Sequence, residues 1–503
     1  MKSQMKTKIY FLVLGLWGFT ACEDKLDVKP HNFSSGENYY QTEGQILRAV
    51  NGAYAQFQGL YGGNVGEGYS WHSMTEMVSD NTTYQYAAPN RGAQQREEID
   101  EFLINASNNY VQQVWSFLYT AIQQTNIILG RVEGVTFANQ ATKDQYTGEA
   151  RFLRALSYFH LVRLFGPVPL RVAEVTSPED AFIRERASVD QVYAQIIADA
   201  EEAVAKLPAT YPAAQKGRAT KGAALTLLGE VYLTRQDYPK AVAALQQVPT
   251  LGYSLLPNYA DVFNPANKNN AESVFEIQFN AGVEGEFSSF IYGFGPYNAS
   301  LPLTGFSGTL GGVNIPTPDL VNAYEPGDER KEASVAYFMD PSNTEYQERF
   351  PDGSIPYVKK FYHPPFAILN RTDENWPVYR YSYALLLLAE ALNEAGQTGE
   401  AQPYLNVVRE RAGLAPLAGL SQEAFREAVF REQRVEVAFE GHRWFQLLRT
   451  NRAVAVMTAH GQQEKQRLSR LSPASYNVQA FKLLYPIPLR EVRLNGFEQN
   501  PGW

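Results

Sequence analysis

Two stretches of the sequence combine aromatic side chains with amides and carboxylates, which are the side-chain types that bind sugars. Aromatic rings pack against the C–H faces of a pyranose, and amides or carboxylates hydrogen-bond its hydroxyls. Residues 71–98 lack a sustained periodicity and predict a long surface excursion, and residues 284–312 are typical of a loop with little regular structure. The alternative is that these aromatics pin their own loops to the scaffold. The candidate ligand-binding residues are Trp71, Asp80, Asn81, Tyr84 and Tyr86 in the first stretch and Tyr292, Phe294, Tyr297 and Asn298 in the second.

Signatures of catalysis are mostly absent, so we predict no catalytic residue, no metal and no cofactor. The six histidines are scattered without metal-ligand spacing, and the chain has neither a phosphate-binding loop nor a nucleophile-elbow motif. A glycoside hydrolase would need two carboxylates roughly 5–9.5 Å apart in a cleft. Among the predicted loops, Glu76 with Asp80 is the one pair worth inspecting for that role.

The charged residues of the predicted C-terminal helices have a structural interpretation. Glu436 and Glu440 are four residues apart on one helix face, with Arg434 and Arg443 beside them. This spacing indicates an ion network between helices rather than acid–base catalysis. His160 lies among apolar helix residues and is expected to be a core histidine.

Cys22, the only cysteine of the chain, stands at the end of an N-terminal export signal. Three lysines precede an apolar run at residues 9–21, which is too short to span a membrane. The sequence FTAC at residues 19–22 resembles a bacterial lipobox, in which the cysteine is acylated and becomes the new N-terminus. Two or more acyl chains hold a protein stably on a membrane. We therefore predict lipidation at Cys22 and membrane attachment through lipid alone, and the alternative is an ordinary secretory signal with a chance cysteine.

The composition is that of an acidic, aromatic-rich globular protein. Of 503 residues, 45% are apolar and 13% aromatic, which suffices for a sizeable core, and the formal net charge is −9. This acidity argues against nucleic acid as a partner, because nucleic-acid binding calls for basic patches. A single cysteine allows no intramolecular disulfide, so stability must come from packing even though the chain is exported.

Helical periodicity dominates both ends of the chain. A capping box at residues 42–45 begins the first predicted helix, and residues 421–450 form a long helical stretch with an expected break at Gly441. Further helices are predicted over residues 111–132, 146–165 and 189–207.

Two segments have the spacing of tetratricopeptide hairpins, and they lie about 160 residues apart. In the first, residues 221–248, the small Gly229 lets the two helices approach closely and Ala241 supplies the small partner. The second, around residues 388–405, repeats these offsets. The predicted fold class is mainly α, with tetratricopeptide-like hairpins forming an α/α scaffold and a large loop-rich insertion containing a few short strands, one of them at residues 272–279.

Short motifs are spread along the whole chain. In chain order they are CEDKLDVKP at 22–30, ARFLRALSYF at 150–159, LFGPVP at 164–169, EALNE at 390–394 with LNVVRERAG at 405–413, RVEVAFEGHRWFQLLR at 434–449, PIP at 486–488 and QNPGW at 499–503. In this order they resemble the SusD/RagB family of outer-membrane lipoproteins from Bacteroidetes. The block at 434–449 departs from the family at Gln446, where Asp is usual, and the closing motif has Trp503 where Tyr is common.

The resemblance implies a non-enzymatic lipoprotein that captures glycans or oligosaccharides on the outer face of the outer membrane. The implied partner is a SusC-like TonB-dependent transporter, with the hairpins facing the barrel and the inserted loops facing the nutrient. A peptide ligand is the alternative within the family, and a surface glycoside hydrolase or a scaffold for protein partners are alternatives from other classes. The family motifs are scaffold residues, so the candidate site depends on loop chemistry alone.

The expected organisation has five parts. They are a signal peptide at 1–21, a tether at 22–38, an N-terminal helical region at 39–250, a loop-rich ligand-facing insertion at 251–377 and a C-terminal helical region at 378–503.

Overall fold

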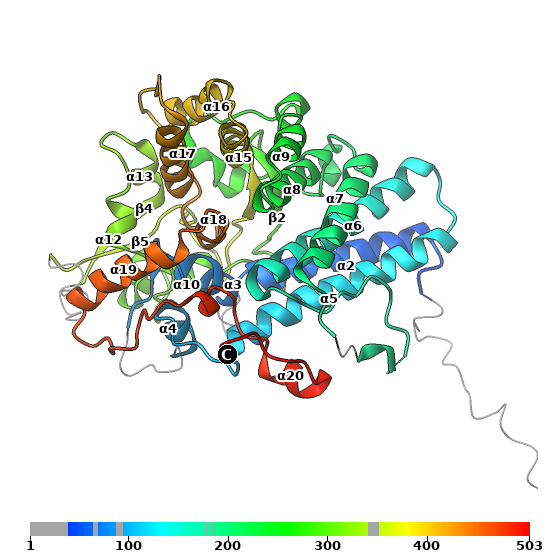
Figure 1. Ribbon diagram of the computed structural model, residues 1–503, viewed down its shortest axis with the longest axis horizontal. Coiled ribbons are helices and arrows are strands. Elements are labelled where there is room, and N and C mark those ends of the chain that lie inside the picture. Colours follow the sequence, from blue (N-terminus) through cyan, green and yellow to red (C-terminus); the bar gives the residue numbers. More distant parts are fainter. Residues whose placement is uncertain (1–38, 64–68, 87–93, 178, 183–184, 341–351) are drawn as a thin grey trace, which may run out of the picture.

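The computed structural model confirms a mainly helical fold with a few short strands (Figure 1). It describes residues 39–63, 69–86, 94–177, 179–182, 185–340 and 352–503. The predicted signal peptide, Cys22 and the tether lie outside the described residues. One main hydrophobic core contains residues from the N-terminal region, the insertion and the C-terminal region, so the division at residues 250 and 377 stays a prediction.

Long helices build the N-terminal region. The capping box predicted at Thr42 is present: its hydroxyl accepts from the Gln45 backbone N–H, and the Gln45 side chain accepts from the Thr42 N–H. The helix predicted from residue 146 begins six residues earlier, at Gln140, because Asn139 caps it, and it ends at Gly166, whose φ of 71° stops the helix. The helices are α2 (Glu43–Tyr61), α3 (Ser70–His72), α4 (Gln94–Asp100), α5 (Asn109–Arg131), α6 (Gln140–Phe165) and α7 (Val189–Lys206).

The two predicted hairpins are α8–α9 (Lys221–Thr234, Tyr238–Leu245) and α15–α16 (Tyr381–Glu394, Thr398–Arg411). They are neighbours in space, because α15 packs against both α8 and α9. Gly229 does allow a close approach, since a Cβ there would lie 2.3 Å from Leu245 Cγ. The atoms nearest to such a Cβ belong to the large Leu245, and the role predicted for Ala241 as the small partner stays a prediction.

The long C-terminal helical stretch is broken where expected. Helix α17 (Gln422–Glu436) and α18 (Arg443–Arg449) are separated by a turn in which Gly441 has a φ of 79°. A Cβ on Gly441 would also lie 2.9 Å from the Thr75 hydroxyl oxygen, so glycine serves both the turn and the packing. Helices α19 (Ala453–Arg467) and α20 (Leu489–Asn495) complete the chain.

The insertion consists of short elements and loops. Residues 284–312, expected to have little regular structure, contain α10 (Phe290–Phe294) and α11 (Ser300–Thr304), and α12 (Pro318–Val321) and α13 (Glu329–Ser334) follow. Three antiparallel strand pairs are present in the described residues: β1 (Thr82–Thr83) with β3 (Ile315–Pro316), β2 (Ser273–Ile277) with β6 (Trp376–Arg380), and β4 (Val335–Met339) with β5 (Ser354–Val358).

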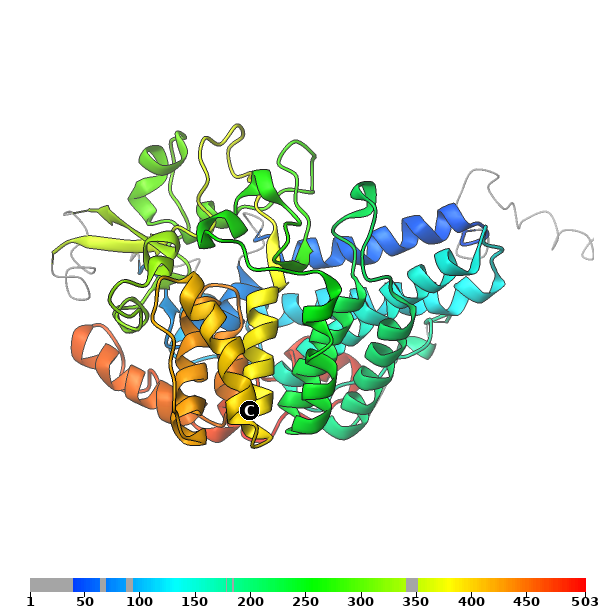
Figure 2. The ribbon, with the colours of Figure 1, turned by 90° about the horizontal axis from the view of Figure 1, so that it is seen from above.

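The insertion and the hairpins occupy different sides of the molecule. In Figure 2 the loops and short strands of the insertion collect along one edge, and α8, α9 and α15–α17 extend from the opposite edge. Pairing of β1 with β3 ties the segment after α3 to the insertion. Within the described part of the chain, no helix is both long enough and apolar enough to cross a membrane.

Candidate functional site

The residues from 71 to 85 are buried, so the prediction of a surface excursion is wrong for this part of it. Trp71 is 2% exposed, and its ring lies against those of His160 and Tyr61, with centroids 4.4 and 5.0 Å away. Tyr84 is fully buried and donates a 2.5 Å hydrogen bond to Glu101. His160 is a core residue, as expected. Neither Trp71 nor Tyr84 has a face open to a ligand in this structure.

Asp80 and Asn81 are engaged by the C-terminal region. Asp80 forms ion pairs with Arg443 Nε at 2.8 Å and Arg434 Nη2 at 2.9 Å. Burial alone would raise the pKa of Asp80, but the two guanidinium groups outweigh it and hold this pKa well below its ordinary value. Asn81 donates to Glu76 Oε1 at 2.8 Å and accepts from Arg434 Nε at 2.8 Å. Glu76 and Asp80 are thus packed inside the fold, where a polysaccharide could not reach them.

Glu76 illustrates how the buried segment joins the two ends of the chain. Burial raises the pKa of its carboxyl group. Its oxygens accept from the backbone N–H groups of Phe439 at 3.0 Å and Gly441 at 2.9 Å. These residues belong to the turn between α17 and α18, so Glu76 fixes that turn against the N-terminal region.

The ion network predicted around Glu436 and Glu440 is present with different partners. Glu436 pairs with Arg330 at 3.0 Å and with Arg380 at 2.9 Å, and Glu440 pairs with Arg380 and Lys360, each at 2.8 Å. The two arginines expected as partners bind the buried aspartate described above. These carboxylates therefore hold β6, α13 and α17 together and have no role in binding from solvent.

The second predicted stretch is divided between core and surface. Phe294 is fully buried, with its ring centroid 5.1 Å from that of His72 and 5.6 Å from that of Tyr69. Tyr292 is also buried, and its hydroxyl lies 3.4 Å from the carbonyl oxygen of Ile368. Tyr297 is half-buried and Asn298 is exposed. Only the last two are open to a ligand.

Tyr297 and Asn298 adjoin Arg96 near the surface of the insertion, and Tyr86 follows a residue that Tyr297 contacts. We call these four residues the Tyr297 site: Tyr86, Arg96, Tyr297 and Asn298. The Tyr297 hydroxyl accepts from Arg96 Nη2 at 2.6 Å. The Tyr297 backbone N–H donates to Gln85 Oε1 at 2.8 Å, and Gln85 directly precedes Tyr86 in the sequence. Tyr86 is half-buried. The structure thus joins members of both predicted stretches, and it adds Arg96, which the sequence did not single out.

The Tyr297 site offers ring, amide and cation chemistry in one place. Asn298 is exposed, and its side-chain amide donates to Asp340 at 2.7 Å. The guanidinium of Arg470 lies 4.7 Å from the ring centroid of Tyr86 and so supports that ring. Half-buried rings with a neighbouring amide and cation suit a polar ligand that has apolar faces, such as a pyranose.

A second aromatic group lies next to this site and was missed from the sequence. Tyr362 and Phe366 are half-buried, with ring centroids 6.0 Å apart, and Phe366 also lies 6.0 Å from Tyr292. Ala299, two residues after Tyr297, packs in the same cluster. The two rings flank Pro364 and Pro365, a pattern that indicates extended chain, and an aromatic residue on each side of this proline pair was the available signal.

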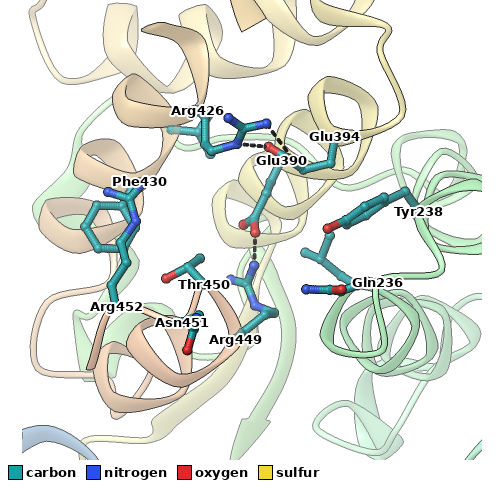
Figure 3. A pocket seen from close by; sticks show the side chains of 12 residues that line it. Gln236, Tyr238, Glu390, Glu394, Arg426, Phe430, Arg449, Thr450, Asn451 and Arg452 are labelled. Atoms are coloured by element: carbon teal, nitrogen blue, oxygen red, sulfur yellow. Dashed lines mark hydrogen bonds and ion pairs between the residues drawn. The ribbon is translucent and has the colours of Figure 1, made fainter. Parts of the chain in front are cut away.

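In two hollows of the structure, most of the polar side chains described below are already hydrogen-bonded or ion-paired with other residues of the protein. One, of about 150 Å³, lies where the two hairpins meet α17 and α18 (Figure 3). There Arg426 binds Glu394 through Nε at 2.6 Å and Nη2 at 2.8 Å, and Arg449 pairs with Glu390. Tyr238 closes the opposite wall. These pairs join α17 and α18 to α15 of the second hairpin, and each of the two arginines is matched by a glutamate.

The other hollow, of about 410 Å³, lies between residues 209–220 and residues 251–276. Arg218 on its wall is bound to Glu149 and Asn51, at 2.8 and 2.6 Å. Asn269 exchanges hydrogen bonds with the amide of Gln278 at 2.8 and 3.0 Å. Among the described residues, no group of three or more His, Cys, Asp or Glu side chains could hold a metal ion.

The architecture is that of a helical-hairpin scaffold that carries a loop-rich face. Comparison with family profiles gives two matches, one described as "SusD family" over residues 271–503 and one described as "Starch-binding associating with outer membrane" over residues 26–233. The chain belongs to the SusD/RagB family.

Relatives of similar length support this assignment. SusD-like protein P25 of Formosa agariphila is 27% identical over 98% of this chain and 97% of its own. The starch-binding protein SusD of Bacteroides thetaiotaomicron is 26% identical over 52% of this chain and 48% of its own.

Solved structures agree with these relatives. A laminarin-binding SusD-like protein superimposes with a TM-score of 0.76 at 26% identity, covering 92% of this chain and all of that one. Surface glycan-binding protein A of B. thetaiotaomicron, solved with laminarihexaose, has a TM-score of 0.74 at 20% identity and the same coverage, which establishes the shared fold.

Proposed function

We propose that this protein is a non-enzymatic, cell-surface lipoprotein that binds glycans or oligosaccharides and delivers them to a SusC-like TonB-dependent transporter in the outer membrane. The observation that carries the binding role is the likeness to the laminarin-binding protein along nearly the whole of both chains. The Tyr297 site supports the binding role with half-buried rings and an exposed amide group on the loop side. Family membership supports the lipid anchor at Cys22, the exterior location and the transporter partner.

The hairpins and the insertion lie on different sides of the molecule, and this separation supports an orientation of the protein on the transporter. Hairpins α8–α9 and α15–α16 would face the barrel, and the insertion with the Tyr297 site would face the nutrient. The role in binding without hydrolysis is supported by the burial of Glu76 and Asp80, the one carboxylate pair that the sequence offered to a hydrolase.

Retention on a panel of immobilised polysaccharides, with an assay for new reducing ends, tests this proposal. We expect retention by at least one polysaccharide and no new reducing ends after prolonged incubation. Release of product would establish a hydrolase, and retention only by peptides would establish the alternative ligand class. Co-purification of a TonB-dependent barrel with the detergent-extracted lipoprotein tests the delivery step.

A further inference from the structure

Arg96 differs from every other buried arginine in the described part of the chain. Seven arginine residues there are buried, and six of them pair with a carboxylate within 4 Å; these are Arg154, Arg163, Arg330, Arg380, Arg409 and Arg443. Arg96 is 7% exposed, and among the described residues it has one hydrogen-bond partner, the Tyr297 hydroxyl, and no acceptor for its Nε. A buried cation without a counter-ion is costly, so an anion that reaches it is bound favourably.

Two buried amides near Tyr297 also have a donor without an acceptor. Gln85 is fully buried, and its Nε2 has no partner among the described residues. The orientation of this amide is fixed, because its oxygen accepts from the Tyr297 backbone N–H, which can only donate. Asn314, likewise buried, has an unpartnered Nδ2 and lies two residues beyond Gly312, whose carbonyl accepts from the Gln85 N–H at 2.7 Å. Three buried N–H donors without an acceptor among the described residues are thus found in this region: Arg96 Nε, Gln85 Nε2 and Asn314 Nδ2.

We propose that the Tyr297 site takes an anionic saccharide, whose carboxylate or sulfate ester pairs with Arg96 while its ring lies on Tyr297. This inference rests on the proposed glycan-binding function and specifies its ligand class. A guanidinium binds planar oxyanions at two points, and the hydrogen bond to Tyr297 uses one N–H group of Arg96 Nη2. The whole chain has a net charge of −9, so its general field does not attract a polyanion and selectivity depends on this local cation.

Affinity gels with charge-matched polysaccharides test the inference. The panel pairs polygalacturonate with its carboxyl-reduced form and carrageenan with its desulfated form, alongside neutral laminarin, starch and xylan. We expect retention by an anionic member, with at least tenfold weaker binding after its charge is removed. Weaker binding of carboxyl-reduced polygalacturonate would indicate a uronate ligand, and weaker binding of desulfated carrageenan would indicate a sulfate ester.

Variants at Arg96 connect the preference to this residue. Arg96→Gln is expected to bind the anionic and the neutralised polysaccharide equally, and Arg96→Lys, which keeps the charge but loses the two-point geometry, is expected to lie between. Arg235→Gln removes an arginine on the hairpin side that pairs with Asp190, and it should leave the preference unchanged. If Arg96→Gln fails to fold, the comparison of Arg96→Lys with the wild type carries the test.

Three results would overturn the inference, and they are distinguishable. Equal retention by a charged polysaccharide and its neutralised form, or retention by neutral members alone, rejects an anionic ligand and leaves the proposed function standing. An anionic preference that persists in Arg96→Gln places the cation elsewhere. Failure to retain any saccharide, charged or neutral, rejects both the inference and the proposed function.

Discussion

Asp80 and Arg443 are 363 positions apart in the sequence and form a two-point ion pair in the core, with Nε–Oδ1 and Nη2–Oδ2 distances of 2.8 and 3.0 Å. Arg434 binds the same carboxylate at 2.9 Å. This pair links the segment after α3 to the start of α18. The polar residues that suggested a sugar site thus hold the two ends of the chain together.

Asp80→Asn is expected to destabilise the protein by about 3–5 kcal/mol, because it leaves two guanidinium groups facing each other without a counter-ion. Denaturant unfolding of the wild type and the variant measures this difference in the free energy of unfolding. The matched control is Glu133→Gln, which breaks a surface pair with Lys143 and should cost about 0–1 kcal/mol. Equal small effects of the two changes would show that the buried pair is not structural.

Gly229→Ala should destabilise the first hairpin by about 1–3 kcal/mol, because the new methyl group would lie 2.3 Å from Leu245 Cγ. Thermal unfolding followed by circular dichroism measures the change. Gly399→Ala is the control in the second hairpin: this glycine is inside α16, and a methyl group there would meet no atom within 4 Å, so alanine should stabilise by about 0.5–1 kcal/mol. Tolerance of both substitutions would mean that the helices of the first hairpin lie farther apart than this structure shows.

The pH dependence of stability should include a contribution from His72. Burial lowers the pKa of His72 to about 3, whereas an unfolded histidine has a pKa near 6.5. Between these values the unfolded chain binds a proton that the folded protein does not, so the free energy of unfolding decreases as the pH falls below 6.5, by about 1.4 kcal/mol per pH unit for this group.

Urea unfolding of the wild type and of His72→Gln at pH 7.5, 5.5 and 4.5 measures this contribution. The glutamine can still donate to the Tyr61 carbonyl, which accepts from His72 Nε2 at 2.9 Å. The variant should lose less stability than the wild type as the pH falls. Identical slopes for the two proteins would contradict a neutral, buried His72.

Cys22→Ser should release the mature protein from the membrane if the lipid anchor is its sole attachment. Partition into a detergent phase of bacterial extracts is the measurement: the wild type should enter that phase, and the variant should stay in the aqueous phase or retain an uncleaved signal. Membrane association of a cleaved variant would show that another segment or a partner holds the protein.

The helices and hairpins could be predicted because their causes are local. The Thr42 capping box, the glycine after α6 and the helical spacing around Gly229 act within a few residues of sequence, and the structure has all three. The short helices α10 and α11 were missed, because five-residue helices leave too little periodicity to detect.

The burial of residues 71–85 could not be predicted, because its causes are distant. Asp80 and Asn81 are typical of a polar loop, and what buries them is two arginines more than 350 positions away. The same limit applies to Arg96, whose contact with Tyr297 spans 201 positions. Composition identified two stretches with sugar-binding chemistry, and tertiary packing decided which of their residues reach the surface.

The most direct test of the central claim compares binding by site and control variants. Tyr86→Ala combined with Tyr297→Ala removes both half-buried rings of the Tyr297 site, and Tyr404→Ala removes a half-buried ring from α16 on the scaffold. Titration calorimetry with the retained polysaccharide is predicted to show at least a tenfold loss of affinity for the double variant and none for Tyr404→Ala. An unchanged affinity in a folded double variant would contradict a glycan site at Tyr297.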